Sequence, residues 1–293
     1  MRKICQPEEK YRERLVRFWI ISDTIPGARA MEKNLLTLRK TLQEMKENYA
    51  FVCLKTGTET EDMGEAEISL LQTITHGILP LSVKIGGPEA RNDIRICHKI
   101  GVSGISAPMI ESEYALRNFI STLKNLIPTP DYEKLKKAIN LETITGYRNL
   151  MDIYDSKAFA DLGQVTAARS DLSASMDKKP DDPEVTRISK KVVQEAKSRG
   201  KVTSVGGTIT KNNFELIANE IEPDFINSRH VMVDTKKAMS ISSIDVAECM
   251  LVFEMDLYEA FSKAFPEKGY YYRNRVEINR ERIGERKVLY FIR

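Results

Sequence analysis

The sequence predicts an α/β protein that folds as a (β/α)8 TIM barrel with a C-terminal extension. Eight apolar segments end about 30 residues apart on average, which is the length of one strand, one helix and their loops. These ends fall near Asp23, Gly57, Lys84, Met109, Glu142, Asp171, Gly207 and Asp234. The segments also lack a regular polar alternation, as expected for strands of a parallel sheet that helices cover.

Strands and helices are expected to alternate along the chain. The first strand is predicted at residues 15–22, which are rich in β-branched and aromatic side chains, and the first helix at 31–48, where leucines recur at helical spacing. The other predicted strands occupy residues 50–55, 81–85, 104–108, 138–142, 165–169, 202–205 and 225–233. Further helices are predicted near 66–75, after Pro88, from the N-cap Ser112 to 127, and near 144–155, 183–199, 212–221 and 241–262.

Two regions follow from this pattern. Residues 1–268 are predicted to form the catalytic barrel, and residues 269–293, with many aromatic and charged side chains, a hairpin or tail outside it that serves as an oligomer contact. Two half-sized doubly wound domains are the competing architecture, but no linker separates such halves.

Composition and charge narrow the class of protein. The chain is 42% hydrophobic and 30% charged, and its 45 lysines and arginines nearly balance 42 aspartates and glutamates. The net charge of +3, without a basic run, gives no argument for nucleic acid. The charged start does not resemble a signal peptide, and no apolar run approaches the ~20 residues of a membrane span. Four scattered cysteines predict neither structural zinc nor disulfides. A cytoplasmic protein without a membrane partner is therefore expected.

Two carboxylates close consecutive predicted strands. Glu142 follows the strand at 138–142, and Asp171 follows the strand at 165–169. The C-terminal ends of barrel strands build the active site, and neighbouring strands lie roughly 4.8 Å apart. Two carboxylates that converge there suit Mg²⁺ or Mn²⁺, which take further oxygens from water and substrate. Each residue could instead cap the helix that follows it, although Thr143 or Ser173 could also do so.

Other candidates lie at the same strand ends. Lys84 ends an apolar strand, where its ammonium could stabilise a carboxylate or enolate, form a Schiff base, or extend past the rim into solvent. Gly86 opens the next helix and could present a free amide to an anion. Arg169 could pair with a substrate carboxylate or bond to a surface loop, beside the Ser170 amide. Gly207 permits close approach of a ligand.

The loop after the strand at 50–55 is acidic. Glu59, Glu61 and Asp62 lie in it, and any of them could act as a general base or simply be solvated. The histidines do not clearly end strands; His230 lies inside the last predicted strand and could face the pocket or the outer layer.

The segment 83–119 resembles the HpcH/HpaI aldolase and citrate lyase β-subunit family, with a basic residue at a strand end, a helix, and a strand that closes in Pro-Met before a glutamate. Residues 138–143 resemble its metal-glutamate strand. Residues 168–176, followed by Asp-Pro-Glu-Val at 182–185, are similar to the segment that carries its metal aspartate. The similarity spans roughly residues 50–240 and continues through Gly206-Gly207 and 225–234.

The resemblance implies an oligomeric pyruvate-type barrel with a divalent metal on Glu142 and Asp171. A pyruvate-like 2-oxo acid or an acyl-thioester would chelate that metal, with its carboxylate on the amides of Ser170 and Asp171. The implied chemistry is carbon–carbon bond cleavage or formation through an enolate. The family's aldolases have a His after a Glu at one strand end, where this chain has none, and an Arg where it has Lys84. Either Glu59 or a metal-bound hydroxide replaces the His, or the substrate differs from the simple hydroxy-keto acids of those aldolases.

The predicted function is therefore a metal-dependent carbon–carbon lyase or aldolase. Two alternatives stay open: a barrel that binds a carboxylated metabolite without turnover, and a metal-free aldolase that forms a Schiff base on Lys84.

Overall fold

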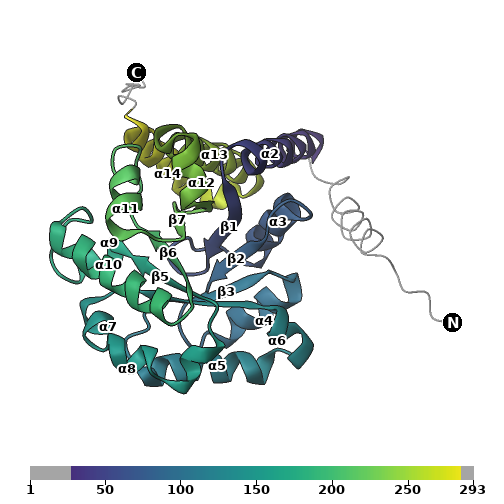
Figure 1. The fold of residues 1–293 in the computed structure, drawn as a ribbon. Coiled ribbons are helices and arrows are strands. Elements are labelled where there is room, and N and C mark those ends of the chain that lie inside the picture. Colours follow the sequence, from purple (N-terminus) through teal and green to yellow (C-terminus); the bar gives the residue numbers. More distant parts are fainter. Residues whose placement is uncertain (1–27, 285–293) are drawn as a thin grey trace.

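A computed structural model describes residues 28–284, and these form an eight-stranded barrel surrounded by helices (Figure 1). The strands close in chain order, which confirms the predicted (β/α)8 TIM-barrel class. They are β1 (Phe51–Gly57), β2 (Leu81–Lys84), β3 (Gly104–Ala107), β4 (Lys136–Leu141), β5 (Gln164–Ala168), β6 (Val202–Gly206), β7 (Phe225–Asn227) and β8 (Val231–Asp234). The strand predicted at 15–22 lies outside the described residues.

The last two strands depart from the predicted pattern. Strands β1 to β7 pair in parallel, but β8 runs antiparallel to both β7 and β1. The single strand predicted at 225–233 is broken at residues 228–230, where the Ser228 amide bonds to the Val231 carbonyl at 2.9 Å. The Ser228 hydroxyl donates to the buried Glu254 carboxylate of α13 (Ser243–Ala264), so a contact remote in sequence stabilises the turn.

This reversal corrects the predicted position of Asp234. Because β8 runs antiparallel, Asp234 pairs with Phe225 at the start of β7, at the end of the barrel opposite to the other strand ends. There its side chain accepts a hydrogen bond from the Lys237 amide and caps α12 (Thr235–Ile241).

The helices lie near the predicted positions. They are α2 (Ala28–Asn48), α3 (Glu65–Thr75), α4 (Arg91–Ile100), α5 (Glu113–Leu126), α6 (Thr129–Lys134), α7 (Ile144–Arg148), α8 (Leu150–Tyr154), α9 (Arg169–Ala174), α10 (Pro183–Ser198) and α11 (Phe214–Ile221), followed by α12, α13 and α14 (Gly269–Ile283). Ser112 caps α5, as predicted, by accepting a hydrogen bond from the Ala115 amide. No helix in the described part of the chain is both long and apolar enough to cross a membrane.

The described part of the C-terminal extension is helical. Helix α14 packs against α13, which also contacts α2, and Figure 1 shows these helices gathered on one side of the barrel. The aromatic side chain of Tyr272 on α14 is fully buried. The division at residue 268 and the oligomer contact stay predictions.

The interior of the barrel is more polar than the apolar strand segments of the sequence had indicated. The outward faces of the strands carry buried aliphatic side chains such as Ile105 and Val165. The inward faces carry short polar side chains that bond to one another: Thr166 to Ser204 at 2.8 Å, and Asn227 to Ser204 at 3.1 Å. These mutual hydrogen bonds compensate for the loss of hydration, so the polar side chains can be buried inside the barrel.

Candidate functional site

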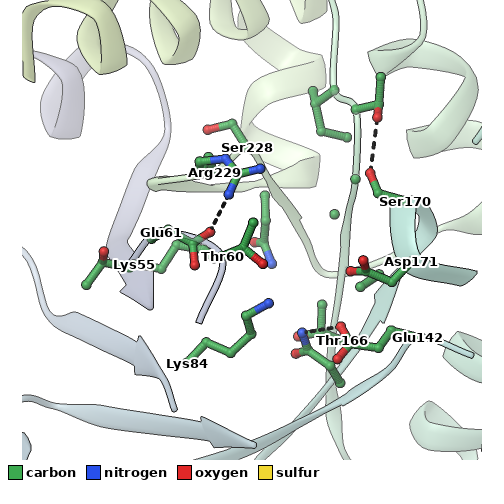
Figure 2. A pocket seen from close by; sticks show the side chains of 18 of the residues that line it. Lys55, Thr60, Glu61, Lys84, Glu142, Thr166, Ser170, Asp171, Ser228 and Arg229 are labelled. Atoms are coloured by element: carbon green, nitrogen blue, oxygen red, sulfur yellow. Dashed lines mark hydrogen bonds and ion pairs between the residues drawn. The ribbon is translucent and has the colours of Figure 1, made fainter. Parts of the chain in front are cut away.

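A polar cavity of about 130 Å³ opens at the C-terminal ends of the parallel strands (Figure 2). Predicted site residues that line it are Lys84, Glu142, Ser170, Asp171 and Gly207. Side chains not assigned a definite role from the sequence also line it, including Lys55, Glu61, Asn140, Asn227, Arg229 and Arg282.

Glu142 is held in the cavity by two hydrogen bonds. Its side chain is 2% exposed; Oε1 accepts from the Met109 amide at 2.8 Å, and Oε2 accepts from Asn140 Nδ2 at 2.9 Å. It does not cap α7, because the Thr143 hydroxyl accepts the bond from the Gly146 amide there. Burial raises the pKa of Glu142 and the Asp171 carboxylate adds to the rise, while Lys84 and the two hydrogen bonds oppose it.

Asp171 faces the same cavity from the following strand end. It lies in the first turn of α9, directly after β5, and it does not occupy the N-cap, which is Ala168. Figure 2 shows the Asp171 and Glu142 side chains on the same wall of the pocket. The structure thus brings the predicted pair of acids together.

The donor set fits a hard divalent cation. Two carboxylates supply oxygen ligands, and Mg²⁺ commonly binds one or two carboxylates while water or substrate completes its shell. A cation beside Glu142 would also compensate for the burial that raises its pKa. Between residues 28 and 284 there is no cluster of three or more His, Cys, Asp or Glu side chains that could hold a metal. The metal therefore stays a prediction that depends on two protein ligands.

The acidic loop after β1 contributes two ion pairs. Lys84 Nζ lies 2.7 Å from Glu59 Oε2, and Arg229 Nη1 lies 2.8 Å from Glu61 Oε1. Burial alone would lower the pKa of Lys84, but Glu59, Glu142 and Glu61 together raise it, so Lys84 is an ammonium at neutral pH. Glu61 lines the cavity, and its Oε2 has no hydrogen-bond partner among the described residues. Glu59, the predicted base, reaches the cavity through its contact with Lys84.

Besides Glu59, two predicted residues do not line the cavity. Arg169 is fully buried, and its guanidinium donates to the Gly207 carbonyl at 2.7 Å and pairs with Asp181 at 2.8 Å. The Gly86 amide is engaged by Asp93 at 2.8 Å. Arg169 therefore supports the backbone at Gly207 from outside the cavity. Gly86 lies in the loop after β2, where Asp93 accepts its amide hydrogen bond.

Among the other lining residues, Lys55 has a signal in the sequence. Lys55 is a lysine near the end of an apolar strand, the same pattern that singled out Lys84. Arg229 and Arg282 had no such signal, because the turn between β7 and β8 and the packing of α14 bring them to the cavity.

The comparisons with known proteins rest on structure alone, since no family model and no curated protein matches the sequence. An HpcH/HpaI aldolase from Desulfitobacterium hafniense superposes with a TM-score of 0.53 at 13% identity, over 65% of this chain and 81% of that one. The chain has the fold of the HpcH/HpaI aldolases. An HpcH/HpaI aldolase/citrate lyase family protein from Burkholderia cenocepacia gives a TM-score of 0.52 at 13% identity, over 64% and 82% of the two chains. The citrate synthase SbnG superposes with a TM-score of 0.51 at 16% identity, over 73% of this chain and 87% of that one.

These likenesses confirm the predicted resemblance to the HpcH/HpaI aldolase fold. At 13% to 16% identity they extend to the fold and not to the chemistry of the site.

Proposed function

We propose that this protein is a metal-dependent carbon–carbon lyase or aldolase that acts through the enolate of a pyruvate-like 2-oxo acid or an acyl-thioester. The observation that carries the proposal is the convergence of Glu142 and Asp171 on one polar cavity at the barrel mouth, with Lys84 between them and the opposite wall (Figure 2). The HpcH/HpaI aldolase fold supports it.

Glu142 and Asp171 would hold the Mg²⁺ or Mn²⁺ ion. When bound, such an ion supplies a Lewis acid that stabilises negative charge on the substrate oxygen. The amides of Ser170 and Asp171 are proposed to hold the substrate carboxylate. Gly207 lies directly beside this point, because a Cβ there would clash with the Ser170 amide.

The remaining residues handle charge and protons. The Lys84 ammonium stabilises the enolate oxygen or the carboxylate electrostatically. Glu59 keeps Lys84 protonated through its ion pair. Glu59, the predicted base, is proposed to move the proton at the substrate carbon. Glu61 is the other candidate, although its Oε2, which has no partner among the described residues, is buried against Gly57 and Arg229 holds its pKa below the usual range. This arrangement takes the place of the histidine found in the family's aldolases.

Exchange of the methyl protons of pyruvate with D₂O tests the proposal. We expect Mn²⁺-dependent exchange, followed by NMR, that falls at least a hundredfold in Glu142→Gln and Asp171→Asn. Asp152→Asn, which removes an exposed carboxylate from α8, is the matched control and should exchange like the wild type. Absence of exchange with pyruvate and with acetyl-thioester, at any Mg²⁺ or Mn²⁺ concentration, would contradict the proposal.

The cellular setting is part of the same proposal. We propose a cytoplasmic homo-oligomer that acts on a small molecule, and light scattering after size-exclusion chromatography measures the assembly. A monomer at micromolar concentration would remove the oligomer from the proposal and leave the chemistry in place.

A further inference from the structure

The cavity has more positive charge than its carboxylates balance once a metal is bound. Its cationic lining residues are Lys55, Lys84, Arg229 and Arg282, and its anionic ones are Glu61, Glu142 and Asp171. Lys84 pairs with Glu59, and Arg229 pairs with Glu61. Under the proposed function, a divalent cation balances Glu142 and Asp171. Lys55 and Arg282 are then the cavity cations that have no ion pair among the described residues.

Neither of these two side chains has a partner of its own. Between residues 28 and 284, the Arg282 guanidinium and the Lys55 ammonium make no hydrogen bond and no ion pair. Partial burial lowers the pKa of both groups, so each would gain from an anion in the cavity. Glu254 opposes this lowering for both groups, and Glu61 opposes it for Lys55, but neither carboxylate forms a direct ion pair with these cations. An anion bound in the cavity would therefore stabilise them further.

Arg282 is held at the cavity by a buried hydrogen-bond network. Asn279, on the same face of α14 one turn earlier, donates to Glu254 Oε2 at 2.9 Å. The other oxygen of Glu254 accepts from the Ser228 hydroxyl at 2.7 Å and from the His230 amide. Helix α14 is thereby fixed to the same β7–β8 turn that carries Arg229.

Arg282 and the two proposed metal ligands lie on opposite sides of the mouth. Because the strands close in order, β4 and β5, which precede Glu142 and Asp171, lie across the barrel from β8 and β1. Arg282 lines the cavity from α14, which Glu254 joins to the turn before β8, and it therefore belongs to the side opposite Glu142 and Asp171. A substrate that reaches from the acids to Arg282 crosses the cavity.

We infer that Arg282, on the C-terminal helix α14, selects substrates with a second anionic group, a carboxylate or a phosphate, at the end remote from Glu142 and Asp171. Lys55 adds to the positive field of that side. The inference rests on the proposed function for the identity of the first end, which is the 2-oxo acid.

Calorimetric titration with three 2-oxo acids tests the inference. The ligands are 2-oxopentanoate with a neutral tail, 2-oxoglutarate with a carboxylate at the same position, and 2-oxo-4-phosphonobutanoate with a phosphonate at that position, each with and without Mn²⁺. We expect at least one anionic ligand to bind wild-type protein about tenfold to a hundredfold more tightly than the neutral one, as a charge-assisted hydrogen bond provides. Which anionic ligand gains more distinguishes a carboxylate from a phosphate.

Variants of α14 assign the preference to one residue. In Arg282→Gln, the affinity for the anionic ligand should exceed that for 2-oxopentanoate by no more than about threefold, while the affinity for 2-oxopentanoate itself stays unchanged. Arg282→Lys should restore part of the preference for the anionic ligand. Arg280→Gln removes an exposed arginine from the same helix and should behave like the wild type. Thermal melting confirms that each variant folds.

The outcomes separate this inference from the proposed function. Equal affinity for charged and neutral tails, a ratio unchanged in Arg282→Gln, or no binding of any of the three ligands would overturn the inference. If the preference for an anionic tail depends on Arg282 but the protein shows no proton exchange, this inference stands and the proposed lyase function is wrong. If the protein catalyses proton exchange but shows no preference for an anionic tail, the proposed function stands and this inference is wrong.

Discussion

Gly207 and Ser170 lie so close together that no other residue fits at position 207. A Cβ on Gly207 would stand 3.0 Å from Ser170 Oγ and 2.9 Å from the Arg169 amide nitrogen, and closer still to the Ser170 amide. Gly207 also has φ of +96°, in the left-handed region that favours glycine. The loop after β6 thus approaches the start of α9 at the point where the substrate carboxylate is proposed to bind.

Gly207→Ala should therefore impair both folding and binding. We expect a loss of about 1–3 kcal/mol in the free energy of unfolding from backbone strain, and at least a tenfold weaker affinity for pyruvate because the new Cβ blocks the Ser170 amide. Gly200→Ala is the control: Gly200 has φ of +71° but no atom near its Cβ position, so it should lose stability without losing affinity. Equal affinity in the two variants would show that the Ser170 amide does not contact the ligand.

Lys84 should be inert as a Schiff-base nucleophile. Imine formation needs a neutral amine, and the ion pair with Glu59, together with Glu142 and Glu61, raises the pKa of Lys84. Borohydride added with pyruvate should leave the mass of the peptide that contains Lys84 unchanged, whereas Lys84→Gln should slow metal-dependent exchange at least tenfold. A reduced adduct on Lys84 would instead favour the metal-free aldolase.

Much of the barrel was predictable because helix and strand periods alternate along the chain. The strands before Lys84 and Glu142 and the helix capped by Ser112 lie where local pattern indicates them. The carboxylates at successive strand ends were also predictable, since parallel strands bring their C-terminal ends to one rim.

The rest depends on contacts remote in sequence. No glycine or proline marks the turn at 228–230; Glu254, more than twenty residues later, stabilises it. The direction of Arg169 depends on Asp181 and on the Gly207 carbonyl, so a residue beside a predicted metal ligand turns away from the cavity. Arg282 reaches the mouth only because α14 folds back onto α13.

Acid should destabilise the fold through the buried His230. This side chain is 1% exposed, donates from Nδ1 to the Lys55 carbonyl at 3.0 Å, and lies against the Tyr258 ring. Burial lowers the pKa of His230 below its ordinary value near 6.5, although Glu254, Glu61 and the Lys55 carbonyl oppose the shift. The folded protein therefore keeps His230 neutral where the unfolded chain binds a proton.

The sign of the effect follows from proton uptake. A group with a lowered folded-state pKa contributes stability above its unfolded-state pKa, and that stability is lost as pH falls below about 6.5, by at most ~1.4 kcal/mol per pH unit. Glu254, whose pKa is also lowered in the fold, adds its own loss in a separate and more acidic range, below its ordinary value near 4.5.

Urea unfolding between pH 7.5 and 5.5 measures the His230 contribution. We expect the free energy of unfolding of the wild type to fall with decreasing pH in this range, and His230→Asn, which keeps a side-chain N–H for the Lys55 carbonyl, to be less stable at pH 7.5 but flatter with pH. His98→Asn, at the partly exposed pair with Asp131, is the control and should keep the wild-type slope. The prediction is wrong if His230→Asn retains the full slope, because the proton taken up on unfolding would then belong to another group.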